Sequence, residues 1–327
     1  MTTDTLLQVK NLHISFNTPY GESRTLRGID FTVERGSIFG IVGESGCGKS
    51  LTGKAILDLV PSAGQITDGE ILFHGDDLRQ KSERERRQLR GNKIGMIFQD
   101  PGAALNPVFS IEQQMLAVMK RHRPEAKSVM RDRAATLLTD VGLPNPDRIL
   151  RLYPHELSGG MQQRVMIATA LLLDAELLIA DEPTTALDVT IQAQILDLLI
   201  KLQEEKGVTI ILITHDMGVV AETCDRMAVF YAGRVVEIGT ATDIFNSPQH
   251  PYTQGLLAAL PHANSRGHDL KVIPGMVPSG YLKSPGCAFA SRCESVMDIC
   301  HETVPPFIQF EAGHQALCHL YAEGSPQ

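Results

Sequence analysis

Gly43-Glu44-Ser45-Gly46-Cys47-Gly48-Lys49-Ser50 is the stretch of this chain that decides its fold. It follows the apolar run Ile38–Val42, which is typical of a buried strand. It precedes residues 51–59, where apolar side chains recur at helical spacing as far as Pro61. The spacing matches GxxxxGK followed by Ser or Thr, a motif that joins a strand to a helix. The sequence therefore predicts a strand, a tight loop and a helix of an α/β protein.

The residue types in this loop suit a bound phosphate group. Successive backbone N–H groups and the positive end of the following helix form a cradle for an anion, and glycine leaves room for close approach. Lys49 is expected to reach the β- and γ-phosphates, and Ser50 to place its hydroxyl on Mg²⁺. A glycine-rich turn that only caps a helix is the alternative, which the joint presence of Lys49 and Ser50 disfavours. The predicted ATP-binding set is Gly43, Glu44, Ser45, Gly46, Cys47, Gly48, Lys49, Ser50 and Leu51, with Glu44, Ser45 and Cys47 contributing mainly backbone.

Two carboxylates end a second apolar run, where Leu177–Ala180 is followed by Asp181 and Glu182. Asp181 is a candidate for holding Mg²⁺, because a hard cation prefers oxygen ligands. Glu182 is the candidate general base that polarises the attacking water. One of the two could instead merely cap the turn at Pro183. Beside an intact phosphate loop, we favour the catalytic interpretation.

Two further polar residues close apolar runs. His215 follows residues 208–214, and its imidazole is a candidate for contacting the γ-phosphate and the water. A single histidine after a strand is more often structural, but its position after the Asp181-Glu182 strand favours function. Gln99 closes residues 94–98 and is a candidate for contacting the water and Mg²⁺ and for sensing a neighbouring subunit.

The order of these motifs resembles that of ATPase subunits of ABC transporters. Leu157-Ser158-Gly159-Gly160-Met161-Gln162 lies between Gln99 and Asp181, and Ala186-Leu187-Asp188 follows Glu182. In that family such segments are the Walker A motif, Q-loop, signature, Walker B motif, D-loop and switch histidine. The resemblance implies ATP and Mg²⁺ as bound groups and a P-loop NTPase fold of ABC type. The catalytic set that it implies is Lys49, Gln99, Glu182 and His215, with Ser50, Gln99 and Asp181 around Mg²⁺.

The resemblance also implies a head-to-tail dimer of two ATPase subunits. The signature residues Ser158, Gly159, Gly160 and Gln162 would act on the ATP of the partner, and Asp188 would belong to the D-loop. An aromatic ring should stack on adenine; Phe16 is the best positional match and Tyr20 the reserve. Ordinary packing in an edge strand is the alternative for Phe16.

The pattern along the chain predicts several subdomains around a parallel core sheet. Residues 6–40 and 66–75 indicate an antiparallel β subdomain, and residues 82–90 a solvated helix. Helical spacing dominates from about 110 to 172, and strands alternating with helices favour the parallel sheet. We therefore expect an ABC ATPase domain over residues 6–257, with a helical subdomain over about 100–172, and a Cys-rich extension over 258–327. The turn-rich residues 100–107 are expected to form no regular element.

Composition and length limit the class of protein. Thirty Lys and Arg against 38 Asp and Glu give a formal net charge of −8, so no nucleic-acid partner is expected. This disfavours a soluble ABC ATPase of DNA repair or translation. No run of 18 apolar residues occurs, and the first residues lack a charged and an apolar signal region. We expect a peripheral protein at the cytoplasmic face of the inner cell membrane.

Short segments narrow the resemblance to the oligopeptide and dipeptide importers. They are Phe98-Gln99-Asp100-Pro101, Leu105-Asn106-Pro107, Tyr153-Pro154-His155-Glu156-Leu157 and His250-Pro251-Tyr252-Thr253. This implies import of dipeptides or oligopeptides through two transmembrane permease subunits, with a second, related but different ATPase subunit. A substrate-binding protein outside the membrane would act indirectly. Nickel, glutathione and antimicrobial peptides remain alternative substrates.

Four of the six cysteines lie in the last 41 residues, at Cys287, Cys293, Cys300 and Cys318. They could form disulfides, a zinc site or an iron–sulfur cluster. A reducing cytosol disfavours disulfides, and the spacing lacks the paired CxxC of structural zinc sites. The resemblance to peptide-importer ATPases favours a [4Fe–4S] cluster. The possible substitute ligands are His301, His314 and His319.

Overall fold

The computed structural model describes residues 4–19, 21–185, 187–260, 273–277 and 285–322. Tyr20 and Ala186 lie outside these residues. The chain divides into two compact units. The first unit comprises Met1–Glu34, Ile38–Arg79 and Thr214–Gln327, and the second comprises Arg35–Ser37 and Gln80–Ile213.

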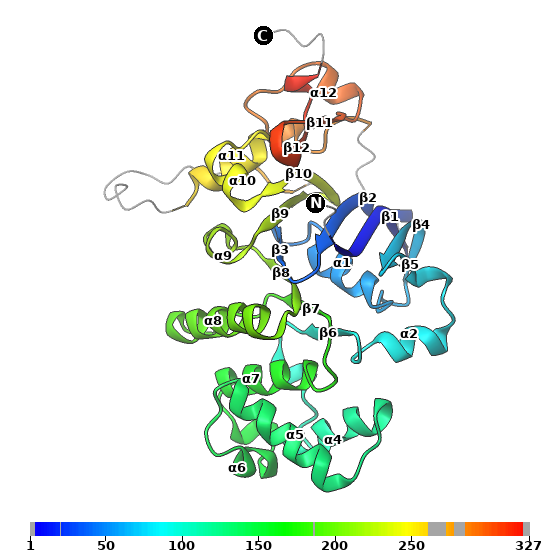
Figure 1. Cartoon of the computed structure of the whole chain (residues 1–327). Coiled ribbons are helices and arrows are strands. Elements are labelled where there is room, and N and C mark those ends of the chain that lie inside the picture. The colour runs from blue at the N-terminus through cyan, green and yellow to red at the C-terminus, as the bar shows by residue number, and fades with distance from the viewer. Residues whose placement is uncertain (1–3, 20, 186, 261–272, 278–284, 323–327) are drawn as a thin grey trace. The chain divides into compact units, whose positions relative to one another are not determined.

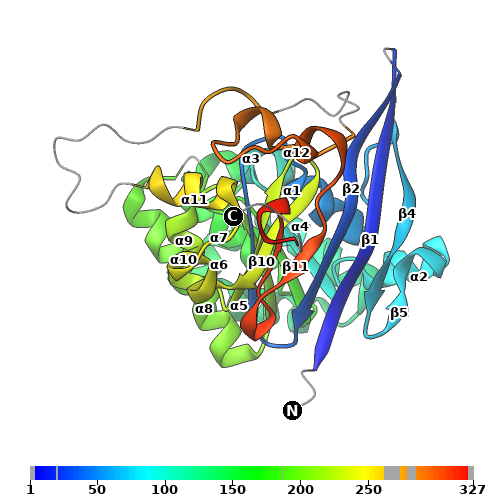
Figure 2. The same ribbon diagram turned by 90° about the horizontal axis from the view of Figure 1, so that it is seen from above.

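An antiparallel sheet of the first unit has the strand order β2-β1-β4-β5 (Figure 1). Its strands are β1 (Thr5–Thr18), β2 (Gly21–Glu34), β4 (Gly64–Phe73) and β5 (Asp76–Asp77). Buried and more exposed residues alternate from Ile29 to Glu34, as expected for a sheet with one face on a core. Figure 2 shows β1 and β2 side by side. The predicted antiparallel sheet is confirmed, except that residues 38–40 belong to a different sheet.

A second sheet of the first unit has the order β11-β12-β10-β9-β3. Its strands are β3 (Ile38–Val42), β9 (Arg226–Tyr231), β10 (Arg234–Thr240), β11 (Phe307–Gln309) and β12 (Gln315–Leu317). β3 and β9 run parallel, whereas β9, β10, β12 and β11 pair antiparallel. All residues of β3 are buried, which explains its uninterrupted apolar sequence.

Helix α1 (Lys49–Ile56) begins directly after the glycine-rich loop, as predicted. It ends earlier than the apolar spacing over residues 51–59 suggests. Asp58 takes a left-handed conformation with φ +54°, which no helix continues. The left-handed turn at Asp58, and not Pro61, therefore marks the end of the helix.

The remaining helices of the first unit lie between and after the strands of its second sheet in the sequence. They are α9 (Met217–Thr223), α10 (Ala241–Asn246), α11 (Pro251–Ala258) and α12 (Ile299–Glu302), with 3₁₀ turns at Ala290–Arg292, Glu311–Gly313 and His319–Tyr321. Helix α11 begins within the His250–Thr253 motif rather than after it. His250 Nδ1 accepts the Tyr252 N–H at 3.0 Å, and Pro251 takes the first helical position.

The C-terminal extension joins the sheet that contains β3. β12 pairs with β10 through Glu237 and Ala316, and β11 extends the sheet by pairing with β12. The extension therefore belongs to the first compact unit rather than forming a unit of its own. The domain boundary after residue 257 stays a prediction.

The second unit contains a parallel sheet of order β8-β7-β6. The strands are β6 (Ile94–Ile97), β7 (Leu177–Asp181) and β8 (Thr209–Thr214), and every residue in them is buried. Helix α8 (Val189–Lys206) leads from β7 to β8 and buries Ile195, Leu198, Leu199 and Leu202. The predicted parallel core sheet is confirmed.

The second unit contains further helices (Figure 1). They are α2 (Glu83–Leu89), α3 (Pro101–Ala104), α4 (Ile111–His122), α5 (Lys127–Asp140), α6 (Pro146–Arg151) and α7 (Gly159–Ala170), with 3₁₀ turns at Leu78–Gln80, on the border of the units, and Pro154–Glu156. Helix α2 matches the predicted solvated helix over residues 82–90, and α3 to α7 lie in the predicted helical region. The expectation of no regular element over 100–107 is wrong. Asp100 Oδ1 accepts the N–H groups of Gly102 and Ala103, which starts the short helix α3. Of the helices that the structure describes, none combines the length and the apolar character needed to cross a bilayer.

A buried carboxylate joins the extension to β10. Glu237 is fully buried and accepts hydrogen bonds from His314 Nε2 at 2.7 Å and from the N–H groups of Gln249 and His250 at 2.7 and 3.0 Å. His250 is itself 2% exposed, and its burial lowers its pKa from the ordinary 6.5 to about 4. His250 therefore stays neutral in the folded chain at pH values where the unfolded chain carries it charged.

We predict that stability falls as the pH drops from about 6.5 to about 4, because only the unfolded chain protonates His250 over that window. The expected loss in unfolding free energy is about 3 kcal/mol. Asn at position 250 can still cap α11 but cannot titrate. Denaturant unfolding at pH 7 and pH 5 should thus show a weaker pH dependence for His250→Asn than for the wild type. Equal dependence would contradict the assignment.

Candidate functional site

The glycine-rich loop lies so close to β9 and β2 that a side chain does not fit at two of its positions. Gly43 has φ +154°, and a Cβ there would lie 2.2 Å from the Phe230 carbonyl oxygen. Gly48 has φ +107°, and a Cβ there would lie 2.4 Å from Leu26 Cδ2. Both distances are below any real contact, so the loop requires glycine at these positions. Packing against the protein therefore accounts for these two glycines of the motif.

Lys49 begins α1 and is 4% exposed. Its ammonium donates hydrogen bonds to the carbonyl oxygens of Gly43 at 2.7 Å and Glu44 at 3.1 Å. Ser50 and Leu51 are half-buried on the same first turn. Cys47 is fully buried, and this burial raises the pKa of its thiol, so the side chain stays neutral. The ammonium rests on the loop that is predicted to hold phosphate.

The Glu44 side chain is held by a residue of the C-terminal extension, while its predicted backbone contribution to ATP binding stays a prediction. Its carboxylate forms a two-pronged ion pair with Arg292, at 2.7 Å to Nη1 and 3.0 Å to Nη2. Its N–H donates to Tyr252 Oη at 3.0 Å. Sequence reasoning assigned no role to Arg292 or Tyr252. The only signal was the His250–Thr253 motif, because Arg292 lies 248 positions from Glu44.

The two carboxylates after β7 occupy different environments in the second unit. Asp181 ends the strand and is 4% exposed. Glu182 takes a left-handed conformation, φ +47°, which is strained for a residue with a side chain. Its N–H donates to the Ile213 carbonyl at 2.8 Å, which fixes the turn. Such strained positions persist where the surrounding structure determines them, and they occur often at functional sites.

The Glu182 carboxylate is oriented by two neighbouring donors. One oxygen accepts from Gln99 Nε2 at 3.1 Å and from Thr185 Oγ1 at 2.8 Å. Gln99 reaches it because β6 and β7 are parallel neighbours whose carboxyl ends share one edge of the sheet. The structure therefore brings together Gln99 and Glu182, as predicted for the Mg²⁺ and water site. Thr185 was missed, since a threonine after Asp-Glu-Pro-Thr carries no distinctive signal.

The signature residues lie at the start of α7. Ser158 caps the helix by accepting the Met161 N–H at 3.4 Å, and both Ser158 and Gly159 are exposed. A Cβ on Gly160 would lie 2.9 Å from Ile191 Cγ2, so glycine is required for packing on α8. Gln162 turns back and donates to the Pro154 carbonyl at 2.8 Å.

Asp188 of the D-loop starts α8, accepting the Ile191 N–H at 3.0 Å. Leu187 Cδ2 lies 3.8 Å from where a Cβ of Gly159 would stand. The D-loop therefore neighbours the signature within the second unit. Ala186 lies outside the described residues.

Phe16 and His215 belong to the first unit. The Phe16 ring is half-buried in β1 and packs over Gly64, where a Cβ would stand 2.7 Å from the ring. This position accounts for the glycine at 64 and leaves the adenine-stacking prediction open. The reserve residue Tyr20 lies outside the described residues. His215 is exposed directly after β8.

The four C-terminal cysteines are free thiols that influence one another. Burial, and then the neighbouring cysteines, raise the pKa of Cys287, Cys293 and Cys318, the last to about 11. Cys287 accepts backbone N–H bonds from Phe289 and Ala290, Cys293 from Ser295, and Cys318 from Leu320. Across the described part of the chain, no group of three or more His, Cys, Asp or Glu is arranged to hold a metal ion.

The three histidines considered as substitute ligands do not join the cysteines in such a group. His314 bonds Glu237, and His319 Nε2 lies 3.0 Å from the Thr303 carbonyl oxygen. His301 is exposed on α12.

Two family models match the chain. The model described as ABC transporter matches residues 26–185, and the model described as oligopeptide/dipeptide transporter, C-terminal region, matches residues 236–300. The two models therefore match most of the predicted nucleotide-binding motifs and part of the region that follows the ATPase motifs.

Relatives match over nearly the whole chain. It is 48% identical to the dipeptide transport ATP-binding protein DppD of Bacillus subtilis over 316 residues, covering 96% of this chain and 94% of the relative. It is 46% identical over 314 residues to DppD of Escherichia coli, covering 96% of each chain. It is 48% identical over 324 residues to the oligopeptide transport ATP-binding protein OppD of Bacillus subtilis, covering 98% and 90%.

Solved structures agree with this likeness. The dimeric structure of MJ0796, a bacterial ABC transporter cassette, matches with a TM-score of 0.65 and 29% identity over 72% of this chain and 99% of that one. A dimeric post-hydrolysis state of the MJ0796 cassette bound to ADP and Pi matches with a TM-score of 0.65 and 28% identity, with the same coverage. These matches confirm the P-loop fold of ABC type.

The contact between Gly43 and Phe230 generates a stability prediction. In the nucleotide-free chain, Gly43→Ala should lower the unfolding free energy by about 3 kcal/mol, because the new Cβ clashes with a backbone carbonyl. Gly46→Ala is the matched control: its φ is +81°, but a Cβ there meets nothing within 4 Å. This control should cost about 1 kcal/mol for the left-handed conformation alone. Equal losses in denaturant unfolding would contradict the clash.

Proposed function

The chain belongs to the ATP-binding proteins of ABC transporters, in the oligopeptide and dipeptide branch, and from this premise we propose that it hydrolyses MgATP to energise the import of dipeptides or oligopeptides. The relatives named above are dipeptide and oligopeptide transport proteins. Import of nickel, glutathione or antimicrobial peptides and a function in DNA repair or translation are therefore not favoured. The observation that carries the proposal is the oriented carboxylate of Glu182 after β7.

The phosphate loop has the features that a nucleotide requires. Glycine at 43 and 48 allows the loop to take its positive φ angles and to pack against Phe230 and Leu26. Lys49 can exchange its loop carbonyl partners for phosphate oxygens. Bound Mg²⁺ would supply positive charge that neutralises the negative charge developing on the phosphates. The residues proposed to hold it are Ser50, Gln99 and Asp181.

Glu182 is the proposed general base. Thr185 and Gln99 donate to the same carboxylate oxygen, which orients the group at the end of a buried strand. A carboxylate fixed in this way can accept the proton of an attacking water. His215 is proposed to contact the γ-phosphate, and Gln99 to contact the water. Phe16 remains the proposed stacking partner of adenine.

The signature is proposed to complete the ATP site of a partner subunit. Ser158 and Gly159 are exposed at the N-terminus of α7, a helix of 12 residues whose positive end suits phosphate. Gly160 and Gln162 lie on the same first turn, and Asp188 lies in the proposed D-loop. ATP binding would thus draw two subunits together and hydrolysis would release them. We propose that the partner is a related but different chain.

The proposed membrane partners are two permease subunits, and a binding protein outside the membrane would contribute indirectly. Apolar side chains are unusually exposed around residues 98–109: Phe98 is 38%, Val108 70% and Phe109 47% exposed. Exposed apolar patches mark interaction surfaces, and this one follows Gln99 directly. We infer that the permeases bind here and hold the chain at the cytoplasmic face of the membrane.

The cysteines of the extension are proposed to hold a [4Fe–4S] cluster. Backbone N–H groups donate to Cys287, Cys293 and Cys318, as they do to the sulfurs of iron–sulfur sites, while burial raises the pKa of each thiol. Together with Cys300 these residues would supply four thiolates, and their spacing lacks the paired CxxC of structural zinc sites.

Glu182→Gln should abolish turnover while ATP still binds, because the amide cannot take the proton of the water. We expect ATP hydrolysis to fall at least about a hundredfold. A dimer loaded with ATP should accumulate in size-exclusion chromatography. Glu204→Gln, an exposed position on α8, is the control and should leave hydrolysis unchanged. Retained turnover in Glu182→Gln would remove Glu182 from the base function.

Anaerobic purification should yield about four iron atoms per chain with visible charge-transfer absorbance. Cys300→Ser should lose this iron, whereas Cys224→Ser, a buried cysteine outside the extension, should keep it. Iron content is measured directly and does not depend on ATPase activity. A wild-type chain without iron after anaerobic purification would contradict the cluster.

A further inference from the structure

Arg292 of the C-terminal extension has every guanidinium donor engaged. Its Nη1 donates to Glu44 at 2.7 Å and to Tyr231 Oη at 3.4 Å, and its Nη2 donates to Glu44 at 3.0 Å and to the Ile273 carbonyl at 3.3 Å. Its Nε donates to the Pro274 carbonyl at 2.8 Å. The side chain is 4% exposed. A buried, fully satisfied arginine that holds a carboxylate with two parallel bonds is fixed in direction.

An aromatic cluster keeps this arginine in place. Tyr231 and Tyr252 are fully buried with ring centroids 4.6 Å apart, and Phe289 of the extension contacts both at 5.2 and 5.4 Å. The Arg292 guanidinium also lies 5.7 Å from the centre of the Tyr231 ring. Burial raises the pKa of both tyrosines, so their hydroxyls stay neutral. The extension is therefore packed directly under the phosphate loop.

The same cluster binds Glu44, the second residue of the phosphate loop. Tyr252 Oη accepts the Glu44 N–H, while Arg292 holds the Glu44 side chain. The Glu44 carbonyl in turn accepts a bond from the Lys49 ammonium at 3.1 Å. Backbone, side chain and carbonyl of one residue thus connect the extension to the phosphate-binding lysine.

The charge of Glu44 makes this connection matter for ATP binding. ATP is strongly anionic, and a free Glu44 carboxylate in the loop would repel it and compete for Lys49. Arg292 neutralises that carboxylate in a largely buried pair, where water screens little. Removing the arginine would leave a negative charge beside the proposed phosphate position.

We propose that Arg292 is a positioning residue for ATP binding, which acts through Glu44 to hold the phosphate loop in its receptive form. The proposal rests on the ATP-binding function argued above. Arg292 does not touch the reacting atoms; it sets the charge and the conformation of the loop that does. The C-terminal extension thereby becomes part of the nucleotide site.

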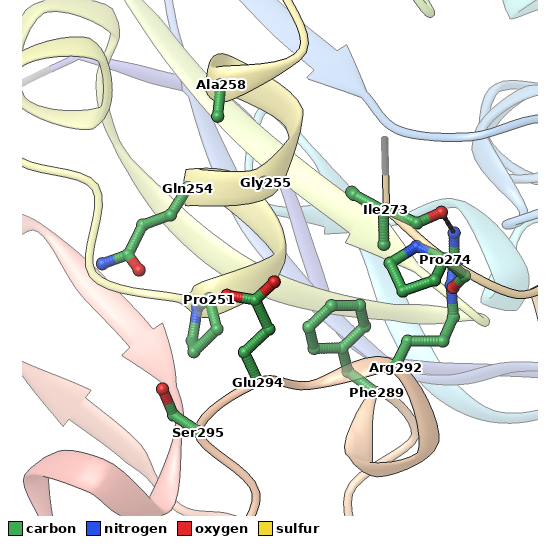
Figure 3. Close-up of a pocket in the computed structure, with 10 residues that line it drawn as sticks. All are labelled: Pro251, Gln254, Gly255, Ala258, Ile273, Pro274, Phe289, Arg292, Glu294 and Ser295. Atoms are coloured by element: carbon green, nitrogen blue, oxygen red, sulfur yellow. Dashed lines mark hydrogen bonds between the residues drawn. The ribbon is translucent and has the colours of Figure 1, made fainter. Parts of the chain in front are cut away.

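The place of Arg292 in the extension explains how it is presented. It ends the 3₁₀ turn Ala290–Arg292, between Cys287 and Cys293, and the Cys287 N–H donates to the Cys300 carbonyl at 2.8 Å. Figure 3 shows Arg292 beside Phe289 at the wall of a pocket of about 240 Å³, with its guanidinium directed to the backbone at Ile273 and Pro274. The cysteine-bearing loop therefore fixes the position of the arginine.

Equilibrium binding of the β,γ-imido analogue of ATP with Mg²⁺ to the purified full chain tests this inference. Arg292→Gln should weaken binding about tenfold, because a charge-assisted pair is lost and Glu44 is left uncompensated. Adding Glu44→Gln to Arg292→Gln should restore most of the affinity, since it removes the repelling charge. Glu44→Gln alone should weaken binding less than Arg292→Gln does. In hydrolysis assays, Arg292→Gln should raise KM for ATP more than it lowers kcat.

Two controls separate the specific effect from misfolding. Arg24→Gln removes an exposed arginine of the same unit that pairs with Glu22, and it should bind the analogue as the wild type does. Denaturant unfolding identifies variants that do not fold. If Arg292→Gln is among them, Arg292→Lys, which keeps the charge but loses the fork, should weaken binding by a smaller factor and serve in its place.

The outcomes are distinct. A folded Arg292→Gln chain with wild-type affinity would overturn the proposal, and so would a weakened variant that Glu44→Gln fails to rescue, because the effect would then be merely structural. Wild-type chain that does not bind the analogue would instead overturn the proposed ATP-binding function, and this inference with it.

Discussion

The phosphate loop approaches strand β9 so closely that only glycine fits at position 43, where a Cβ would lie 2.2 Å from the Phe230 carbonyl. This approach requires β9 to lie parallel beside β3, the strand that leads into the loop. The β9–β10 hairpin secures the loop further, because the Gly233 N–H donates to the Cys47 carbonyl at 3.0 Å. The residue after Phe230 is Tyr231, which begins the aromatic cluster under the loop. The contact between Gly43 and Phe230 thus links the phosphate loop to the core sheet and to the aromatic cluster of the extension.

Much of the fold follows from periodicity and turn chemistry. The uninterrupted apolar runs at β3, β6, β7 and β8 form buried parallel strands. Both faces of such a sheet are covered, so every position in these strands favours an apolar residue. The errors are local and have physical reasons. Asp58 adopts a left-handed turn that ended α1 before Pro61, and Asp100 capped a helix too short to show a period. Spacing arguments are weakest where one side chain decides the end of an element.

Parts of the candidate site could be derived from the sequence because they depend on chain order. Gln99 and Glu182 each follow a core strand, and parallel strands bring their carboxyl ends to one edge. The pairing of Glu44 with Arg292 could not be derived, because 248 positions separate them and neither residue type is unusual. The hydrogen bond from Thr185 to Glu182 could not be predicted either, since a hydroxyl after a strand has no distinctive sequence pattern. Contacts between distant segments depend on packing that no local pattern encodes.

The central claim is that MgATP hydrolysis by this chain energises peptide import, and reconstitution tests it most directly. The assembled complex, purified with its permeases and partner ATPase, would be placed in proteoliposomes with its peptide-binding protein, and uptake of labelled dipeptides and oligopeptides would be measured. The account predicts peptide uptake that requires hydrolysable ATP and stops when Lys49→Ala removes the phosphate-binding ammonium. Peptide uptake that continues without ATP hydrolysis, or ATP hydrolysis that no peptide uptake accompanies, would contradict it.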